Sequence, residues 1–332
     1  TPTVAATNAS YTITATNTGG SDSTSIYIEV LNSGGTLTVT PTHSTGSVNS
    51  TLASIAATYS HSLTIPSWTS GVTNTSVVAN TNHPLAGTAI AAWDNGDLVI
   101  AWTRPIYNGS TQHDVLAISV YDGSSWTTQD IDTASRTGYR PSVAIDNQGA
   151  LHIAYLDRDN TNLRYATNAS GSWVLSTLDN SSVNPNNVAA KTGIAIDNRG
   201  HVHIIHPVQG SSVWVLNYTT NVSGSFVSTT ITDTTKDDGK YASLAIAGNG
   251  SLHISVYRDS GGSDLRYYTD ESGVWTNETV RTGDNYGKDS VIALNSKDEV
   301  VVVYRKDDSS DDIYVSVGTV SYTHLRAHET LT

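Results

Sequence analysis

The sequence predicts an all-β protein built as a β-propeller of four-stranded blades, on three observations. Apolar residues fall in short alternating runs bounded by Gly, Asn, Asp and Ser, and long helical periodicities are absent. A unit of about fifty residues recurs along the chain. Each unit has room for four strands. A row of sandwich domains would need about 100 residues per unit, so the period favours blades.

The repeat is clearest in the second half of the chain. Copies begin at residues 141, 192 and 242, a truncated copy begins at 290, and a looser one begins near 88. Within the copy at 141, we expect strands at 141–146, 150–156, 163–168 and 172–178. Four blades and the first three strands of a fifth fit within 83–318. We therefore expect an incomplete ring.

Two tight turns and one aromatic position recur in every unit. The first turn of the copy at 141 is Asn147-Gln148-Gly149, which needs a positive φ, and the second is Ala169-Ser170-Gly171. The glycines of the first turn set the register of the repeat at Gly96, Gly149, Gly200 and Gly250, with Asp298 in the same position. The fourth strand of each unit carries a large aromatic residue: Trp126, Trp173, Phe226 and Trp275.

The beginning of the chain does not follow the repeat. Residues 1–30 predict two alternating strands around Thr18-Gly19-Gly20-Ser21. The string YTITATNTGGS and the run after it resemble the closing hairpin of bacterial and archaeal immunoglobulin-like surface domains. This resemblance implies that 1–30 is the C-terminal fragment of such a domain. We interpret 31–82 as a connector with edge strands at Thr36–Thr40 and Ser62–Ile65.

The last residues, 319–332, also lack the repeat. The string SYTHLRAHET resembles a translated sequencing adapter, which implies a non-native tail. The alternative is a terminal helix that places His324 and His328 one turn apart, a spacing used for metals. The chain also contains no methionine, so with both ends it is expected to be part of a longer protein.

Composition excludes several classes of protein. The 332 residues include no cysteine, which excludes disulfides and thiol chemistry. A formal charge of −13 with 14% charged residues argues against nucleic acid as a partner. No apolar run of about 18 residues is available to span a membrane. The weakly charged, Tyr- and Trp-containing β-rich composition indicates an extracellular or cell-surface protein, and the oligomeric state stays open.

The repeat pattern SxAIDxxGxxHxxYxDxxxxxLxYATxxxGxW resembles the sialidase-like and bacterial-neuraminidase-repeat-like propellers of secreted and surface proteins, over about 83–318. The resemblance implies a propeller fold and an arginine triad, a Tyr–Glu pair and an acidic Asp if the chain is a sialidase. The sequence departs from that pattern. It lacks the Ser-x-Asp-x-Gly-x-x-Trp box, and Glu271 and Glu278 are the only glutamates in the repeats up to residue 280.

A candidate binding surface lies where the first strand of each blade begins, around the channel mouth. Cations and tyrosines recur there, and the loops between second and third strands add charges on the same face. Tyr can stack on a sugar, and Arg or Lys can pair with an acidic group. The alternative is that these residues form salt bridges between blades or keep loops soluble. The candidates are Tyr139, Arg140, Asp157, Arg158, Lys191, Lys240, Tyr241, Arg258, Asp259, Tyr286, Lys288 and Arg305.

Metal sites are less favoured. His152, His203 and His253 recur in the second strand, where we expect packing between blades with a hydrogen bond. Calcium stays an alternative at Asp157-x-Asp159-x-Thr161 and within 307–312, although neither segment has the glycine of an EF-hand loop. We therefore predict no cofactor and no catalytic metal.

The sequence supports three functions. The first is a surface-protein propeller that binds or adheres through an anionic glycan at the channel face. The second is a sialidase-like glycoside hydrolase or a lyase, which a carboxylate pair at glycosidase distance in the channel would favour. The third is a structural spacer. No catalytic residue is assigned from the sequence.

Overall fold

The computed structural model describes residues 6–17, 20–30, 36–39, 57–60, 87–108, 111–134, 136–181, 187, 189–210, 213–283, 285–295, 299–307, 312–318 and 326–328. Every described element is a β-strand, and no helix occurs among these residues. The chain divides into two units, Thr1–Thr75 and Ser76–Thr332, which are treated separately below.

The first unit contains two strand pairs. Strand β1 (Ala6–Asn17) pairs antiparallel with β2 (Gly20–Val30), with Asn17 opposite Gly20 beside the turn. The hairpin expected within 1–30 is therefore confirmed, and its immunoglobulin-like origin stays a prediction. Strand β3 (Thr36–Val39) pairs with β4 (Ala57–Ser60). The strand expected at Ser62–Ile65 lies outside the described residues.

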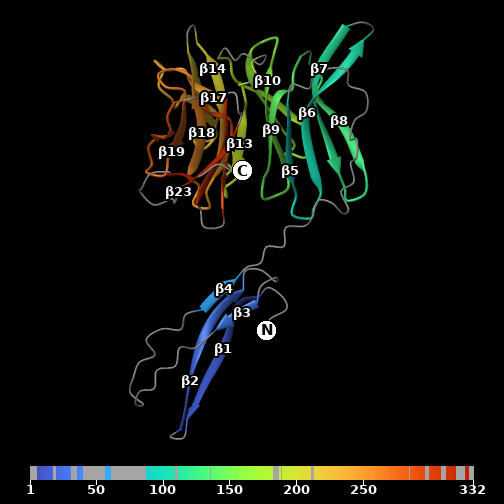
Figure 1. Cartoon of the computed structure of the whole chain (residues 1–332). Coiled ribbons are helices and arrows are strands. Elements are labelled where there is room, and N and C mark those ends of the chain that lie inside the picture. The colour runs from blue at the N-terminus through green and yellow to red at the C-terminus, as the bar shows by residue number, and fades with distance from the viewer. Residues whose placement is uncertain are drawn as a thin grey trace. The chain divides into compact units, whose positions relative to one another are not determined.

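The second unit is a series of five antiparallel blades (Figure 1), of which blades 3 and 4 are joined into one sheet by a single parallel bridge between Val215 and Asp238. Blade 1 contains β5 (Thr88–Ala92), β6 (Leu98–Asn108), β7 (Thr111–Tyr121) and β8 (Trp126–Asp132). Blade 2 contains β9 (Tyr139–Ile145), β10 (Leu151–Asp157), β11 (Asn162–Thr167) and β12 (Val174–Asp179). Blade 3 contains β13 (Gly193–Ile196), β14 (Val202–Gln209), β15 (Trp214–Thr220) and β16 (Val227–Thr230). Blade 4 contains β17 (Asp238–Ile246), β18 (Leu252–Arg258), β19 (Asp264–Thr269) and β20 (Thr276–Arg281). Blade 5 contains β21 (Tyr286–Leu294), β22 (Val300–Lys306), β23 (Ile313–Gly318) and β24 (Arg326–His328).

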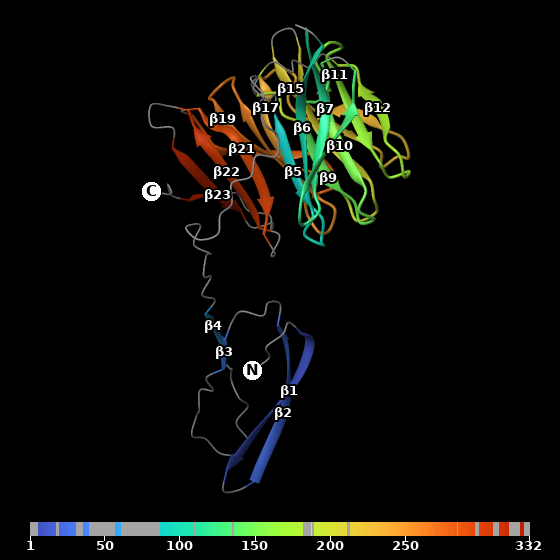
Figure 2. The same cartoon turned by 90° about the vertical axis from the view of Figure 1, so that its right-hand side faces the viewer.

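The blades follow one another through their first strands. Strand β5 packs against β9, β9 against β13, β13 against β17, and β17 against β21. Figure 1 labels the first four of these strands, and Figure 2 labels β17 and β21. Within the described part of the chain, no comparable packing joins β21 back to β5. The prediction of an all-β propeller with an open ring is therefore confirmed.

The core lies between blades: the sheets of blades 2 to 4 are covered on both faces, and those of blades 1 and 5 on one, since Ile90, Val291 and Val303 are exposed. Every residue of β10 is buried, on whichever face of the sheet its side chain lies. One cluster joins Val99 and Leu116 of blade 1 to Ile153 and Tyr155 of blade 2. Burying a side chain of this size contributes about 1.5–3 kcal/mol. The blades are therefore stabilised by their neighbours rather than by a core of their own.

The recurring aromatic of the fourth strand also joins neighbouring blades. The ring of Phe226 in blade 3 lies 5.3 Å from that of Tyr165 in blade 2. The ring of Trp275 in blade 4 lies 5.3 Å from that of Tyr218 in blade 3, edge to face. Such pairs are worth about 0.5–1.5 kcal/mol beyond their buried area. This contact is the physical reason for the aromatic position in the repeat.

The turns between first and second strands hold adjacent blades together. We call the end of the blades where these turns lie the turn end. Trp93 Nε1 donates to the Gly149 carbonyl at 2.9 Å, and Asn198 Nδ2 donates to the Gly248 carbonyl at 3.2 Å. Asn147 Nδ2 makes the corresponding contact to the Asn198 carbonyl at 3.5 Å. A side chain of one turn thus contacts the backbone of the next.

Blade 5 differs from expectation in its fourth strand. We expected only three strands there, yet β24 pairs antiparallel with β23, with His328 opposite Val315. The free edge of β23 exposes unpaired backbone groups, and β24 supplies partners for them. Residues 326–328 form a strand, so the alternative of a terminal helix is wrong for them, and His324 lies outside the described residues.

Candidate functional site

The first strands of blades 2, 4 and 5 begin with the same irregularity. In each, the register with the second strand shifts near the strand start, so two residues face one. The residue at this bulge has a left-handed backbone, with φ of 50° at Arg140, 53° at Tyr241 and 53° at Asp289. The left-handed conformation costs about 1–2 kcal/mol at each of these three residues, since none is glycine. Strain of this kind clusters at binding and catalytic sites.

The strand pairing corrects the alignment of the repeat. Because Ser142, Gly193, Ser243 and Val291 pair with equivalent residues of the second strands, equivalent positions can be read directly. Lys240 and Lys288 are therefore equivalent to Tyr139, one residue before the position of Arg140. Adjacent residues of a strand point to opposite sides, so the recurring cations form two sets. The shared position of the bulge residues is occupied by Gly87, Arg140, Lys191, Tyr241 and Asp289.

The side chains at this position meet those of blade 5. Lys191 Nζ lies 3.3 Å from Asp289 Oδ1, although blade 4 separates them in sequence. Lys191 Nζ also lies 5.7 Å from the centre of the Tyr241 ring. Arg305 Nη2 lies 3.2 Å from Asp289 Oδ2. Side chains of several blades thus converge where the first strands begin, which we call the mouth end.

We define the central cluster as Arg140, Lys191, Tyr241, Lys288, Asp289, Arg305 and Asp307. Arg305 Nη1 donates to Asp307 Oδ1 at 2.9 Å, and Lys288 also pairs with Asp307. Those contacts hold the pKa of Asp307 below its usual range. Burial, together with the charge of Asp289, raises the pKa of Tyr241, so its hydroxyl stays a protonated donor at neutral pH.

Arg140 is the cation of the cluster whose charge is not compensated. Its side chain is half-buried, and it has no ion pair or side-chain hydrogen bond within the described part of the chain. Its Nε is buried and has no hydrogen-bond partner there. Burial lowers the pKa of Arg140, and the neighbouring Tyr241 opposes this effect. A buried donor without a partner costs about 1–3 kcal/mol.

The remaining predicted residues take part in contacts outside the central cluster. Tyr139 is buried, its hydroxyl donates to the Asp114 carboxylate, and Arg158 Nη1 donates to the Tyr139 oxygen at 3.0 Å. Tyr286 is also buried, and the Arg281 guanidinium lies 4.5 Å from the centre of its ring. These residues support packing within and between blades.

Blade 4 contains two further pairs. Arg258 donates through Nε and Nη2 to Asp238 Oδ2 at 3.0 and 2.5 Å, and the Tyr268 hydroxyl donates to the same oxygen. Lys240 Nζ lies 2.6 Å from Asp259 Oδ2 and also pairs with Asp237. Arg258, Asp259 and Lys240 therefore hold loops of blade 4 together.

The structure brings Arg140, Lys191, Tyr241, Lys288 and Arg305 together and leaves the other predicted residues in these separate contacts. Asp289 is a central residue that sequence reasoning missed, whereas Asp307 was considered there within the calcium alternative at 307–312. The strand register would have identified Asp289, because it occupies the position of Arg140 in the repeat. An acidic residue at that position does not match a search for recurring cations.

The recurring histidines lie near the turn end. The Nδ1 atom of each histidine is hydrogen-bonded to the hydroxyl of a tyrosine in the third strand of its own blade, at 2.5–2.7 Å. The pairs are His152–Tyr165, His203–Tyr218 and His253–Tyr267. The expected hydrogen bond is therefore present within a blade. The tyrosines Tyr165 and Tyr218, rather than the histidines, make the aromatic contacts to the next blade.

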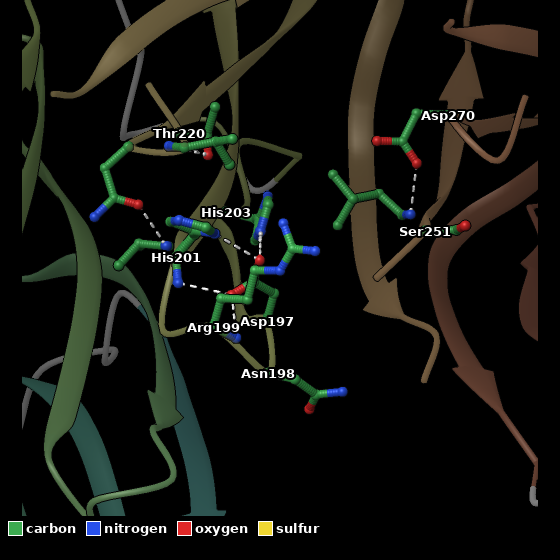
Figure 3. A network of polar contacts seen from close by, with 12 residues as sticks. Asp197, Asn198, Arg199, His201, His203, Thr220, Ser251 and Asp270 are labelled. Carbon is green, nitrogen blue, oxygen red and sulfur yellow. Dashed lines mark hydrogen bonds and ion pairs between the residues drawn. The ribbon is translucent and has the colours of Figure 1, made fainter. Parts of the chain in front are cut away.

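Figure 3 shows the polar network around Asp197 in blade 3. Asp197 Oδ1 accepts the backbone N–H groups of Arg199 and His201, at 2.9 and 2.7 Å. Its Oδ2 lies 2.7 Å from His201 Nδ1 and 3.7 Å from His203 Nε2. Burial lowers the pKa of His203, and Asp197 opposes this effect. The network ties the turn to the second strand.

In blade 2, the segment considered for calcium has a carboxylate oxygen that already accepts hydrogen bonds from the backbone. Asp157 is buried, and its Oδ1 accepts the backbone N–H groups of Asp159 and Asn160, both at 3.0 Å. Residues 308–311 of the other segment lie outside the described residues. Where the chain is described, no group of three or more His, Asp or Glu side chains is arranged to hold a metal ion. No helix of sufficient length and apolarity to span a membrane is present among the same residues.

No protein-family model matches this chain, and no curated protein matches it significantly. Solved structures are similar in fold. A protein of unknown function from Dyadobacter fermentans has a TM-score of 0.53 at 12% identity over 74% of this chain and 83% of its own. An ulvan lyase, described as a new family of polysaccharide lyase and bound to -[GlcA(1-4)Rha3S]-, has a TM-score of 0.51 at 12% identity, over 74% of this chain and 69% of its own. These similarities support the propeller fold.

Proposed function

We propose that this chain is a binding propeller of an extracellular or cell-surface protein, and that it recognises an anionic glycan at the central cluster. The observation that carries the proposal is the uncompensated guanidinium of Arg140. It lies at a strained backbone position, next to Tyr241. A carboxylate or sulfate group would pair with it through two parallel hydrogen bonds.

The partly exposed ring of Tyr241, beside Arg140, suits the rest of a sugar. It packs edge to face at 6.0 Å on the ring of Tyr257, which is itself buried and supports it. Lys288 Nζ lies 5.6 Å from the centre of the Tyr257 ring. Tyrosine offers an apolar face to a sugar ring and a hydroxyl to its oxygens. The cluster therefore combines an anion site with a stacking surface.

Charge supports the same interpretation. The chain as a whole is acidic, with a formal charge of −13. In the central cluster, however, Arg140, Lys191, Lys288 and Arg305 outnumber the carboxylates of Asp289 and Asp307. A local positive potential within an acidic protein attracts an anionic ligand to one place and repels it elsewhere.

Binding is favoured over acid–base catalysis by the state of the carboxylates. Asp289 and Asp307 are both ion-paired with Arg305, and each has a second cation partner. A general acid would need a raised pKa, whereas the pKa of Asp307 is lowered. The similar ulvan lyase binds a glucuronate-containing glycan. That lyase is an example of a similar fold with an acidic glycan as ligand.

A glycan array tests the proposal. We expect the protein to bind carboxylated or sulfated glycans, and Arg140→Ala to reduce the affinity about 50-fold, as expected for a charge-assisted pair. Arg104→Ala is the matched control, because Arg104 pairs with Asp130 in blade 1, outside the central cluster. Equal binding by Arg140→Ala and the control would overturn the proposal. Cleavage of a bound glycan, detected by mass spectrometry, would support the hydrolase or lyase instead.

A further inference from the structure

Asp289 occupies the place in the central cluster where an additional anion would otherwise bind. Its Oδ1 lies 3.3 Å from Lys191 Nζ, and its Oδ2 lies 3.2 Å from Arg305 Nη2 and 3.3 Å from Arg305 Nε. These contacts reach from blade 5 to blade 3 and to the second strand of blade 5. Asp289 thus makes with two cations the contacts that a carboxylate or sulfate of a ligand would make.

The backbone holds Asp289 in this position at a cost. Its φ is 53°, in the left-handed region where only glycine is free of strain. Arg140 and Tyr241 occupy equivalent bulges in blades 2 and 4, with the same backbone conformation. One repeat position therefore supplies a cation, a phenol and a carboxylate, with the charge of Asp289 acting on Tyr241 and Tyr241 neighbouring Arg140. The carboxylate is half-exposed, at 47%, so solvent and ligands can reach it.

The cations of the cluster differ in whether Asp289 or Asp307 neutralises them. Lys191 and Arg305 have Asp289 as a partner, and Lys288 and Arg305 have Asp307. Arg140 has no ionic partner among the described side chains. A ligand with one anionic group can bind Arg140 without breaking an ion pair. A ligand with a second anionic group nearby would place it against Asp289, where like charges repel.

We propose that Asp289 is the specificity-determining residue of the central cluster, and that it selects glycans with a single anionic group over multiply sulfated glycans. This inference rests on the proposed function, since it takes the central cluster as the glycan site. The selectivity comes from repulsion: Asp289 adds no contact to the glycan with a single anionic group, and it repels the multiply sulfated glycan.

The test compares two probes that differ only in sulfation. The first is a disaccharide of a uronic acid and an N-acetylhexosamine, with one carboxylate and no sulfate. The second is the same disaccharide carrying two sulfates. Calorimetry gives the affinity of each for the wild-type protein, Asp289→Asn and Asp130→Asn. The last variant is a matched control, because it also replaces an ion-paired aspartate, on the fourth strand of blade 1.

We expect Asp289→Asn to raise the affinity for the disulfated probe about tenfold, because two partly exposed ion pairs no longer compete with it. Affinity for the unsulfated probe should change less than about twofold, and Asp130→Asn should alter neither. Equal gains for both probes, or no gain for the disulfated one, would overturn the role of Asp289 and leave the glycan site in place. Failure of both probes to bind either wild type or Asp289→Asn would overturn the glycan site itself, and with it this role.

Discussion

Positive φ angles occur at both ends of the blades, and different residues adopt them. At the turn end they belong to glycines, with φ of 82° at Gly149 and 83° at Gly200, where the absence of a Cβ removes the strain. At the mouth end glycines such as Gly138 and Gly287 also have positive φ, but so do Arg140, Tyr241 and Asp289, which retain the strain. In blade 1 the same repeat position is Gly87, whose φ of 134° differs from the 50–53° of Arg140, Tyr241 and Asp289. The strain at the mouth is therefore found where a residue with a side chain adopts the left-handed backbone.

The two ends also differ in how their polar side chains are hydrogen-bonded. At the turn end, Asp146 and Asp197 accept hydrogen bonds from backbone N–H groups and from histidines. At the mouth end, Arg140 Nε is buried without a hydrogen-bond partner among the described residues; at the turn end His203 Nε2 is too, but the other nitrogen of that imidazole bonds the Tyr218 hydroxyl. The carboxylates thus hold the turn end together, whereas the mouth end carries the unpartnered cation on which the proposed binding rests. Four experiments separate these roles.

The largest effect is expected at the turn end. Asp197→Ala should lower the free energy of unfolding by about 2–3 kcal/mol, because it removes the acceptor of two turn N–H groups and of His201. Urea denaturation measures this change. Asp94→Ala, an exposed acid in the corresponding turn of blade 1, should leave stability nearly unchanged. Equal losses in the two variants would contradict a specific role for Asp197.

Gly200→Ala isolates the backbone contribution of the same turn. A Cβ at Gly200 would meet no heavy atom within 4 Å, so the substitution adds strain without a clash. We expect a loss of about 1–2 kcal/mol in urea denaturation. Gly248→Ala, at a position that is equally open but lacks the positive φ, is the control and should cost less.

The mouth end should respond in the opposite direction. Asp289→Gly and Asp289→Ala both remove the carboxylate, but only glycine relieves the strain at a φ of 53°. Asp289→Gly should therefore be more stable than Asp289→Ala by about 1 kcal/mol. Differential scanning calorimetry of the two variants measures this difference in stability. If alanine proved equal to glycine, the bulge would store no strain.

The smallest effect is a dependence on pH. Burial opposes the ionisation of Asp197, but hydrogen bonds from His201 and from the backbone outweigh it and lower the pKa of its carboxyl. A lowered pKa in the folded state contributes stability above the unfolded-state pKa, about 4, which is lost as pH falls through the folded value. The stability gap between wild type and Asp197→Asn should therefore be constant near pH 5 and shrink below about pH 4. A gap that widens under acid would contradict this assignment.

The strands and turns of the blades could be predicted closely. In blade 2, the strands expected at 141–146, 150–156, 163–168 and 172–178 correspond to Tyr139–Ile145, Leu151–Asp157, Asn162–Thr167 and Val174–Asp179. These elements follow from local rules, because alternation, turn glycines and aromatic positions each act within a few residues. The fourth strand of blade 5 did not follow the repeat and was missed for that reason.

The site was predicted less well. The recurring cations agreed to within one residue, yet one residue decides to which side a strand side chain points. Arg140 and Lys191 reach the central cluster from the bulge position. One residue earlier, Lys240 pairs with Asp237 and Asp259 in its own blade, and Lys288 reaches the cluster only through Asp307. The bulges that set this register are tertiary features with no motif of their own.

By itself, the sequence determined the architecture: an all-β chain, a repeat of about fifty residues, four strands to a unit and glycine at the turns. These properties depend on periodicity and on local backbone preferences. Only the tertiary structure decided which charges meet. The contact between Lys191 and Asp289 joins residues from blades 3 and 5, and the missing partner of Arg140 depends on every neighbour. Packing of the blades sets those distances, and electrostatic pairing follows distance rather than sequence order.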